Sequence, residues 1–389
     1  MPTKALVLGS GLVGGVMAAD LLATRGVAVS VADQDAEALE RTVAACRRTA
    51  QRAPRIVVAD LSEPAEIRRL AEEHDIVVGA LASHLAFAAL RAVLEAGRPC
   101  ADIAFMAEDA LELDAFARRR GVTAIVDCGV APGMSNLLAG VAARRLRPCE
   151  RIEIVVGGLP VERRMPFQYK AGFAPADVIE EYTRPARIVE DGKLVVRPAL
   201  SGREIIELPG VGSVEAFNTD GLRSLASTLK VPAMRERTLR WPGHVEAMLA
   251  FREAGFFSTD PIRVGDMRVV PREVTAALLF PKWSYEPGEA DLTVMRVVGE
   301  GRLDGVPARL TWDLLDFLDR ESGFTSMART TAFPCTLVAR ELAAGRLRRP
   351  GVAAPEALAA DEELVERILQ GLRKRGVRFE LSAESIDEP

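Results

Sequence analysis

The chain has 389 residues, of which 49% are hydrophobic and 27% are charged, a balance typical of a globular protein long enough for two domains. Its 50 lysines and arginines against 55 aspartates and glutamates leave a net charge of -5, which argues against nucleic acid as a partner. Five scattered cysteines predict reduced, buried thiols and no metal site. With neither a leader-like segment nor an apolar stretch of membrane-spanning length, we expect a cytoplasmic protein with no membrane partner.

The first predicted element is a strand at residues 4–8, which leads into a glycine-rich turn and an alanine-rich helix. The turn reads Gly9-Ser-Gly11-Leu-Val-Gly14, the spacing of a dinucleotide-binding βαβ unit. Its glycines allow a tight turn, a close approach of the backbone to a pyrophosphate, and close packing of the helix on the sheet. A diphosphate would then lie on free N–H groups at the helix N-terminus. The expected cofactor contacts in this turn are Gly9, Gly11, Leu12, Val13 and Gly14.

A second predicted strand, residues 27–32, ends at Asp33. An acidic residue at this distance from the glycine turn accepts hydrogen bonds from the adenosine ribose. Gln34 and Asp35 follow, so no arginine comes next to hold a 2′-phosphate. The sequence therefore favours NAD over NADP as the cofactor.

Alternating short apolar runs and helical stretches continue to about residue 130. The further strands are predicted at residues 55–58, 76–80, 100–103 and 122–126, and the helices at 65–73, 85–95 and 107–120. This alternation predicts a Rossmann domain over residues 1–130, with a doubly wound parallel sheet that binds ligands at the carboxyl ends of its strands. Further cofactor contacts are expected, after the third and fourth strands, at Asp60, Leu61, Leu81, Ser83 and His84, although His84 could instead only start the next helix.

The pattern changes near Arg151. Strand-like segments at 152–156 and 193–197 are interrupted by Gly157-Gly158, Pro160 and Asp191-Gly192, and segments 292–298 and 306–313 flank a glycine-rich stretch as in a hairpin. We therefore predict an α+β substrate domain over residues 131–325, with a mostly antiparallel sheet. Predicted helices at 331–344 and 362–375 lie in a final region, residues 326–389, which we expect to return to the Rossmann domain; its last few residues are acidic.

Motifs spread over nearly the whole chain resemble those of the lysine 6-dehydrogenases, a branch of the saccharopine-dehydrogenase-like group. They lie at residues 9–14, 126–136, 157–160, 180–185, 215–221, 238–244, 323–330 and 351–356. In glutamate-forming saccharopine dehydrogenases, the segment after the sixth strand looks like Gly-Leu-Asp-Pro-Gly-Ile-Asp-His. The corresponding segment of this chain is Gly129-Val-Ala131-Pro-Gly-Met-Ser135-Asn136, which has no acidic residue at the two aspartate positions. Trp241-Pro-Gly-His244 also resembles the lysine branch, whereas Phe167-Gln168 departs from its usual pattern.

The resemblance implies NAD-dependent oxidative deamination of the lysine side-chain amine. The products would be ammonia, NADH and aminoadipate semialdehyde, which cyclises to piperideine-6-carboxylate. Hydride can leave the carbon only when the nitrogen has a free lone pair, so the substrate ammonium must first lose a proton to a general base. The resemblance also implies a homo-oligomer.

Four residues are candidates for this catalysis, each with a structural alternative. His244 has an unperturbed pKa suited to a base, but could simply hydrogen-bond a neighbouring loop. Lys170 could act as a base or grip a carboxylate, or lie on the surface. Asp102 and Asp127, at strand ends, could attract the substrate ammonium or cap the helices that follow.

A lysine-like substrate also needs a cation for its α-carboxylate. Arg240 and Arg329 lie within the shared motifs and could supply a bidentate anchor, or serve a structural role. The other expected substrate contacts are Tyr169, Asn136, Thr219 and Asp220.

Two other functions remain open. One is another carbon–nitrogen dehydrogenase of the same group, acting on saccharopine or a carboxylated polyamine such as carboxynorspermidine. The other is a catalytically silent NAD-binding regulatory protein, because a fold does not guarantee its chemistry.

Overall fold

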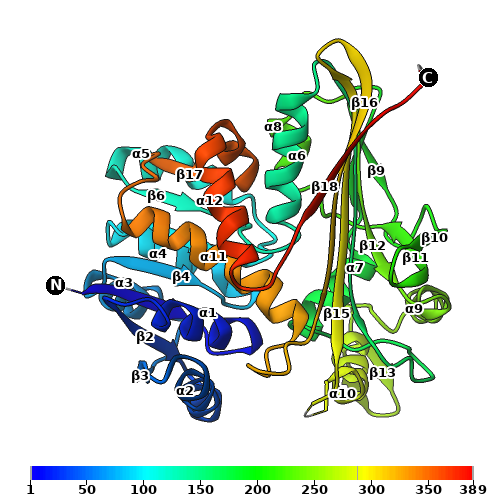
Figure 1. Cartoon of the computed structure of the whole chain (residues 1–389). Coiled ribbons are helices and arrows are strands. Elements are labelled where there is room, and N and C mark those ends of the chain that lie inside the picture. Colours follow the sequence, from blue (N-terminus) through cyan, green and yellow to red (C-terminus); the bar gives the residue numbers. More distant parts are fainter. Residues whose placement is uncertain (1, 287, 388–389) are drawn as a thin grey trace. The chain divides into compact units, whose positions relative to one another are not determined.

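A computed structural model describes residues 2–286 and 288–387 of the chain. These residues form two compact units, coloured by sequence in Figure 1. Within the described residues, the first unit comprises residues 2–141, 319–324 and 328–378, and the second comprises 142–286, 288–318, 325–327 and 379–387. The expected boundary at residue 130 thus falls inside the first unit, and the region 326–389 is divided between the two.

The first unit is built on a seven-stranded parallel sheet in the order β17-β6-β5-β4-β1-β2-β3. Its strands are β1 (Thr3–Leu8), β2 (Val27–Asp33), β3 (Arg55–Val58), β4 (Ile76–Gly79), β5 (Cys100–Asp102), β6 (Thr123–Ile125) and β17 (Gly351–Ala353). The predicted doubly wound α/β fold is confirmed. Strand β17 was not predicted, because a three-residue segment between Pro350 and Pro355 is typical of a connecting loop.

The helices of this unit follow the predicted alternation, with one correction. They are α1 (Leu12–Leu22), α2 (Ala36–Ala50), α3 (Pro64–Glu72), α4 (Ser83–Glu95), α5 (Asp114–Arg120) and α12 (Glu362–Arg373), together with α6 (Met134–Arg145) and α11 (Ser326–Ala343), which begin or end across the division. The single helix predicted at 107–120 is wrong. Asp109 caps a short 3₁₀ turn by accepting from Leu111 N at 3.0 Å, and α5 starts only after it.

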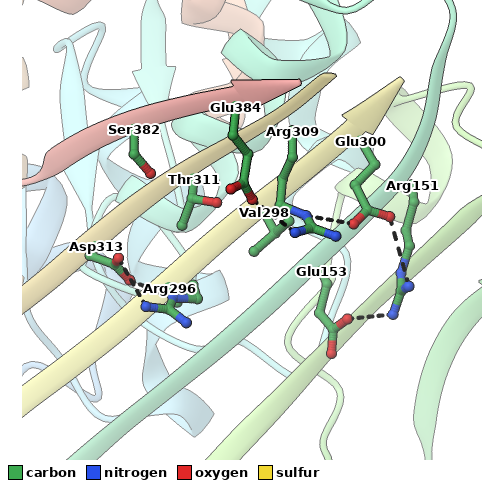
Figure 2. Close-up of a pocket in the computed structure, with 10 residues that line it drawn as sticks. All are labelled: Arg151, Glu153, Arg296, Val298, Glu300, Arg309, Thr311, Asp313, Ser382 and Glu384. Atoms are coloured by element: carbon green, nitrogen blue, oxygen red, sulfur yellow. Dashed lines mark hydrogen bonds and ion pairs between the residues drawn. The ribbon is translucent and has the colours of Figure 1, made fainter. Parts of the chain in front are cut away.

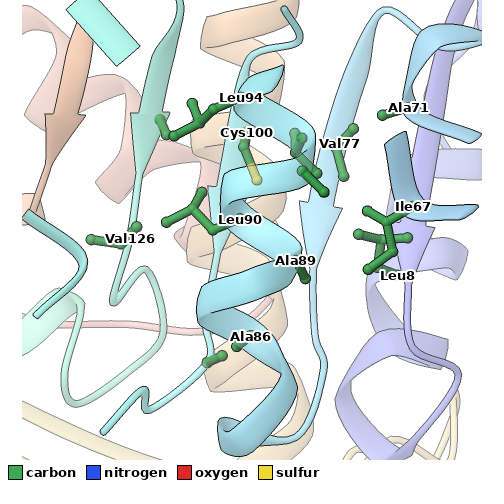
Figure 3. Close-up of a cluster of buried hydrophobic side chains, with 14 of the residues drawn as sticks. Leu8, Ile67, Ala71, Val77, Ala86, Ala89, Leu90, Leu94, Cys100 and Val126 are labelled. Atoms are coloured by element: carbon green, nitrogen blue, oxygen red, sulfur yellow. The ribbon is translucent and has the colours of Figure 1, made fainter. Parts of the chain in front are cut away.

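One hydrophobic core of the first unit gathers around α4 (Figure 3). Ala86, Leu90 and Leu94 recur at four-residue spacing along α4 and are buried together with Cys100 of β5 and Val77 of β4. This spacing places them on one side of the helix, where small alanines allow a close approach to the sheet. All five cysteines of the chain are buried free thiols.

A buried carboxylate ties the late helices of the first unit to α1. Asp20 accepts from Arg375 Nε at 2.6 Å, Arg340 Nη1 at 2.7 Å and Thr336 Oγ1 at 2.5 Å. Burial by itself would raise the pKa of Asp20, but the charges of Arg340 and Arg375 outweigh it and the pKa is lowered. The carboxylate is therefore paired on all sides.

We predict that Asp20→Asn lowers the free energy of unfolding by about 3 kcal/mol, because it leaves two half-buried guanidinium groups without their buried counter-ion. Because the pKa is lower in the folded state, the loss should be constant above the unfolded-state pKa of about 4 and shrink as the pH falls below it. Urea unfolding followed by circular dichroism measures both. Glu72→Ala, which removes an exposed ion pair with Arg68, should have little effect; an equal effect of the two variants would contradict this account.

The second unit is built on a mixed nine-stranded sheet, with a separate small hairpin. The main path is β10-β11-β12-β7-β15-β16-β18, and β8 joins β12 and β9. The strands are β7 (Cys149–Pro160), β8 (Ala186–Glu190), β9 (Lys193–Arg197), β10 (Glu204–Leu208), β11 (Gly212–Asn218), β12 (Ala233–Arg240), β15 (Asp291–Leu303), β16 (Val306–Phe317) and β18 (Glu380–Ser385). The hairpin is β13 (Ile262–Val264) with β14 (Met267–Val269), and the helices are α7 (Pro175–Thr183), α8 (Leu225–Thr228), α9 (His244–Glu253) and α10 (Pro271–Trp283).

The sheet is mostly antiparallel, as predicted, but β7 and β12 pair in parallel. Gly157 and Gly158 do not break β7. A Cβ on Gly157 would lie 2.7 Å from Leu239 Cβ, and one on Gly158 would lie 2.3 Å from Met327 Cε. These glycines therefore serve close packing inside a strand, and reading them as strand breaks was wrong, whereas β7 does end at Pro160.

The predicted hairpin at 292–313 exists, but its strands are longer and its turn is shorter. β15 and β16 pair through Leu303 and Val306, which leaves Asp304 and Gly305, both at positive φ, as the turn. Gly299, predicted in the loop, lies within β15, where a Cβ would be 2.7 Å from Ala142 Cβ.

Two late elements also differ from the predictions. Helix α11 begins at Ser326 instead of Thr331, because Asp291 accepts from the N–H groups of Ser326 at 2.7 Å and Met327 at 2.9 Å. This cap comes from a residue far upstream in the sequence. The end of the chain forms β18, which pairs with β16. Among the described residues, every helix is too short or too polar to be a candidate membrane span.

Candidate functional site

The glycine turn of the first unit has the close backbone contacts that its motif requires. Gly9 adopts φ +97°, and a Cβ on Gly14 would lie 2.1 Å from the carbonyl oxygen of Gly9. A Cβ on Gly11 would meet no atom within 4 Å. Gly9 and Gly14 thus fix the strand, turn and helix, while the backbone at Gly11 faces open space where a ligand can approach.

Asp33 lies at the end of β2 and beside this turn. Its Oδ2 accepts from Ser10 N at 2.6 Å and its Oδ1 accepts from Asp35 N at 2.9 Å, which orients the carboxylate. The N-terminus of α1 has no side-chain cap, and Leu12 is 60% exposed. Free helix N–H groups and a fixed carboxylate suit a diphosphate and a ribose, so these residues fit a dinucleotide.

The other expected cofactor contacts lie near the carboxyl ends of β3 and β4. Asp60 is exposed, and hydrogen bonds from Ser62 hold its pKa below the usual value. Leu61 is buried, Leu81 and Ser83 are half-buried, and His84 is exposed on the first turn of α4. Their contact with a cofactor stays a prediction.

Asp102 is a buried carboxyl group at the carboxyl end of β5. Its Oδ1 accepts from Ala104 N at 2.7 Å, and Gly79, its partner on β4, leaves the room it needs, since a Cβ there would be 1.7 Å from Oδ2. Burial, with a further contribution from Asp127, raises the pKa of Asp102 to about 6, despite the lowering effect of the Ala104 hydrogen bond. Asp127 itself is buried, at φ +49°. The two aspartates therefore lie close enough for their charges to interact.

Two other expected site residues of the first unit are also buried. The Asn136 side chain accepts from Gly133 N at 3.3 Å and Ser135 Oγ at 3.0 Å. Arg329 donates to the carbonyl of Arg375 at 2.5 Å. Both are less than a tenth exposed, so these contacts favour structural roles, and substrate contact stays a prediction.

In the second unit, His244 lies at the centre of a directed chain of hydrogen bonds. Its Nδ1 is 2.8 Å from the carbonyl of Phe167, which can only accept, so Nδ1 carries the proton and Nε2 accepts from Tyr182 Oη at 2.8 Å. Arg240 Nε in turn donates to Tyr182 Oη at 3.2 Å. Burial, and then the charge of Arg240, lowers the pKa of His244 to about 3. The imidazole is therefore neutral with both nitrogens occupied, which suits positioning better than proton uptake.

The guanidinium of Arg240 is buried between aromatic rings and a carboxylate. It lies 4.5 Å from the centre of the Tyr169 ring and donates from Nη2 to Glu181 at 2.5 Å. The Tyr169 ring is 4.8 Å from His244 and 5.4 Å from Trp283. The structure thus brings Tyr169, Arg240 and His244 together, and we call this group, with Tyr182 and Glu181, the arginine cluster.

A second buried polar group lies on the same side of β12. Glu236 accepts from Thr219 Oγ1 at 2.7 Å, and Thr219 is 2.8 Å from Thr238. Burial raises the pKa of Glu236 to about 8. Asp220 forms a bidentate ion pair with Arg187, which donates from Nε at 2.8 Å and from Nη2 at 2.9 Å. Thr219 and Asp220 are therefore already engaged within the protein.

Lys170 follows Tyr169 in the chain but points to different partners. Its Nζ donates to the carbonyl of Ser284 at 2.6 Å and lies 3.3 Å from Glu289. Only 14% of the Lys170 side chain is exposed, so it is not the surface lysine of the structural alternative.

Sequence reasoning missed several residues of this region, namely Glu181, Tyr182, Glu236 and Trp283. Glu181 and Tyr182 lie within the shared motif at residues 180–185, so a signal for them was present. Glu236 and Trp283 gave none, because their burial depends on contacts between distant segments.

Comparisons with known proteins now identify the family. A model described as the saccharopine dehydrogenase NADP binding domain matches residues 5–125, and one described as the saccharopine dehydrogenase C-terminal domain matches residues 129–377. The chain belongs to the saccharopine dehydrogenase family.

Several curated proteins are distant relatives of this chain. The saccharopine dehydrogenase [NADP(+), L-glutamate-forming] of Schizosaccharomyces pombe is 21% identical over 85% of this chain and 89% of its own length. The carboxynorspermidine synthase of Vibrio cholerae is 25% identical over 63% of this chain and 60% of its own length. The bovine mitochondrial alpha-aminoadipic semialdehyde synthase is 24% identical, but the match spans only 36% of its length.

A solved saccharopine dehydrogenase (L-Glu forming), the apo protein from Saccharomyces cerevisiae, has the same fold. It matches with a TM-score of 0.79 over 98% of this chain and 100% of its own, at 16% identity. At this identity the likeness concerns the fold alone.

The hydrogen-bond chain predicts the state of His244 in this family member. Its ring should carry a proton on Nδ1 only and should not titrate between about pH 5 and 8, because protonation of Nε2 would displace the Tyr182 donor and add a charge beside Arg240. Nitrogen-15 NMR of the imidazoles measures this, with His244→Gln to assign the signals. A ring that gains a proton within this range would overturn the positioning role.

Proposed function

We propose that this protein is an NAD-dependent oxidoreductase that deaminates the side-chain amine of L-lysine oxidatively. The proposal rests on one observation above others: a chain of the saccharopine dehydrogenase family whose segment 129–136 lacks the two acidic residues typical of the glutamate-forming enzymes. Ala131 and Ser135 stand at those positions. A substrate with fewer charges than saccharopine suits this loss.

The lysine ammonium must be deprotonated before hydride can leave the adjacent carbon. A bound nicotinamide cofactor would supply the hydride acceptor. Asp102 is our candidate for the proton acceptor. Its raised pKa of about 6 leaves the carboxyl group ionised at neutral pH, and it makes the carboxylate a stronger base than that of an exposed aspartate. His244, with a pKa of about 3, would instead hold Tyr182 in place and thereby position Arg240 and Tyr169.

Arg240 and Lys170 remain the candidates for the substrate carboxylate, and each already has a carboxylate partner. Glu181 faces Arg240 and Glu289 faces Lys170. A substrate carboxylate would therefore compete with an internal ion pair. Lys170 is the better placed, because Arg240 is only 2% exposed.

NAD is favoured over NADP by the position of Asp33. Its two carboxylate oxygens lie beside the glycine turn, where a 2′-phosphate would meet a second negative charge. The matching family model carries NADP in its description, and so does the S. pombe relative. The cofactor preference of this chain is thus proposed from its own residues.

The second candidate is saccharopine or a carboxylated polyamine as substrate, favoured by the relatives from S. pombe and V. cholerae. One assay separates the possibilities: purified protein with NAD or NADP and with L-lysine, saccharopine or carboxynorspermidine, followed by the absorbance of the reduced cofactor. We expect turnover with NAD and lysine and release of ammonia. Glutamate released from saccharopine would transfer the proposal to the second candidate, and cofactor binding without any turnover would support a regulatory protein.

For the lysine reaction, Asp102→Asn should lower kcat/KM by about 100-fold or more, because it removes the proton acceptor. In the wild type kcat/KM should rise with pH through about 6 as Asp102 ionises, and this inflection should vanish in the variant. The affinity for NAD should be nearly unchanged. Glu108→Gln, an exposed change nearby, is the control. A variant that keeps both the rate and the inflection would remove Asp102 from the mechanism.

A further inference from the structure

Charged side chains of the second unit are either fully paired or open to water in most places. The three guanidinium nitrogens of Arg240 donate to Tyr182, to the carbonyl of Leu239 and to Glu181. The shallow hollow on β7, β15, β16 and β18, about 440 Å³ in volume, is lined by arginines that pair with carboxylates of neighbouring strands and are partly open to water (Figure 2). Neither place leaves a described charged atom that is both buried and unpaired.

Glu289 differs from these residues. Its Oε2 accepts from the backbone N–H of Glu286 at 2.9 Å and lies 3.3 Å from Lys170 Nζ. Its Oε1 is buried and has no hydrogen-bond partner among the described residues, and only 7% of the side chain is exposed. A buried carboxylate oxygen without a donor is unfavourable and therefore requires an explanation.

Lys170, the partner of Glu289, also keeps an unused donor. An ammonium group has three N–H donors, and the described contacts of Nζ are with two acceptors, the carbonyl of Ser284 and Glu289. Trp283, which precedes Ser284, likewise buries an indole N–H for which the described residues offer no acceptor. The backbone N–H of Ala171 donates to the carbonyl of Trp283 at 2.8 Å and holds these segments side by side. Donors and an acceptor are thus left over in one region.

The unused atoms match the head group of an α-amino acid. Such a head group carries an ammonium, which only donates, and a carboxylate, which only accepts, on the same carbon. On the Lys170–Glu289 pair, the ammonium would meet Glu289 Oε1 and the carboxylate would meet Lys170 Nζ, so that positive and negative groups alternate. A carboxylate alone would compete with Glu289 for Lys170, whereas the whole head group leaves the internal ion pair intact.

We propose that Lys170 and Glu289 form the subsite for the α-amino-acid head group of the substrate, with Glu289 binding the α-ammonium and Lys170 the α-carboxylate. The inference deepens the proposed function and rests on it for the nature of the substrate. Ser284 and Glu286 are exposed, and 14% of the Lys170 side chain is exposed, so the pair lies just beneath the surface. The subsite would select α-amino acids over simple amines.

Three amines that differ only in the head group test this subsite. L-Lysine has both charges, cadaverine keeps the ammonium but lacks the carboxylate, and 6-aminohexanoate keeps the carboxylate but lacks the ammonium. With the wild type and NAD, kcat/KM should be about 100-fold lower for each truncated amine than for lysine, because each leaves one charge of the pair unmatched. The absorbance of NADH measures these rates.

Two variants should have crossed effects on the three amines. Glu289→Gln should lower kcat/KM about 30-fold for lysine and cadaverine, and less than about threefold for 6-aminohexanoate. Lys170→Gln should lower it about 30-fold for lysine and 6-aminohexanoate, and less than about threefold for cadaverine. Glu253→Gln, whose side chain is 72% exposed on α9, should change none of the rates. Equal losses for all three amines, or no loss, would overturn the inference.

A binding measurement separates this inference from the proposed function. L-Norleucine has the head group but no side-chain amine, so calorimetry with the NAD-loaded wild type should show that it binds about 10-fold or more tightly than hexanoate or pentylamine. If no amine is oxidised but norleucine binds in this way, the proposed function fails and the subsite stands. If lysine is oxidised but norleucine binds no better than hexanoate, the subsite fails and the proposed function stands. This comparison uses the wild type alone, so it decides the matter even if a variant does not fold.

Discussion

A charge buried in a protein must be paired, and this constraint organises the interior of both units. Arg240 is almost fully buried, and its position is fixed by Glu181, by Tyr182 and by the face of the Tyr169 ring. The cost of desolvating such a group is large, so every neighbour must either neutralise it or stay uncharged. His244, which lies beside Arg240, stays uncharged. Its neutrality follows from its burial and then from the charge of the arginine beside it, which together outweigh the hydrogen bond that it donates to the carbonyl of Phe167.

The same constraint separates two residues that looked equivalent in the sequence. His244 and Asp102 are both ionisable and both buried, but their surroundings move their pKa values in opposite directions. A cation beside the histidine disfavours a second positive charge. A carboxyl group without a cation near it holds its proton more tightly, and Asp127 strengthens this effect. For the reaction that we propose, Asp102 is therefore the better candidate for the proton acceptor.

The first unit could be predicted well because its signals are local. Apolar runs, glycine spacing and strand-end aspartates each act within a few residues, and the strands from β1 to β6 lie where these patterns placed them. The errors in the second unit share one physical cause. Gly157, Gly158 and Gly299 resemble turn residues, but each makes room for a side chain that arrives from a distant segment. The cap of α11 by Asp291 and the burial of Glu236 and Trp283 are equally long-range. Of the arginine cluster, Tyr169, Arg240 and His244 were predicted, whereas Glu181 and Tyr182 were recognised only as part of a shared motif.

The path of the chain has a consequence for how the molecule is made. Strand β17 and helix α12 complete the first unit, yet they follow almost the whole of the second unit in the sequence. A ribosome releases residues in order, so the nucleotide-binding half emerges early and stays unfinished until the last tenth or so of the chain has appeared. Strand β6 has an open edge during this interval. A truncated product that ends before residue 350 would expose that edge permanently, and a cell would meet it as an incomplete sheet prone to unwanted pairing.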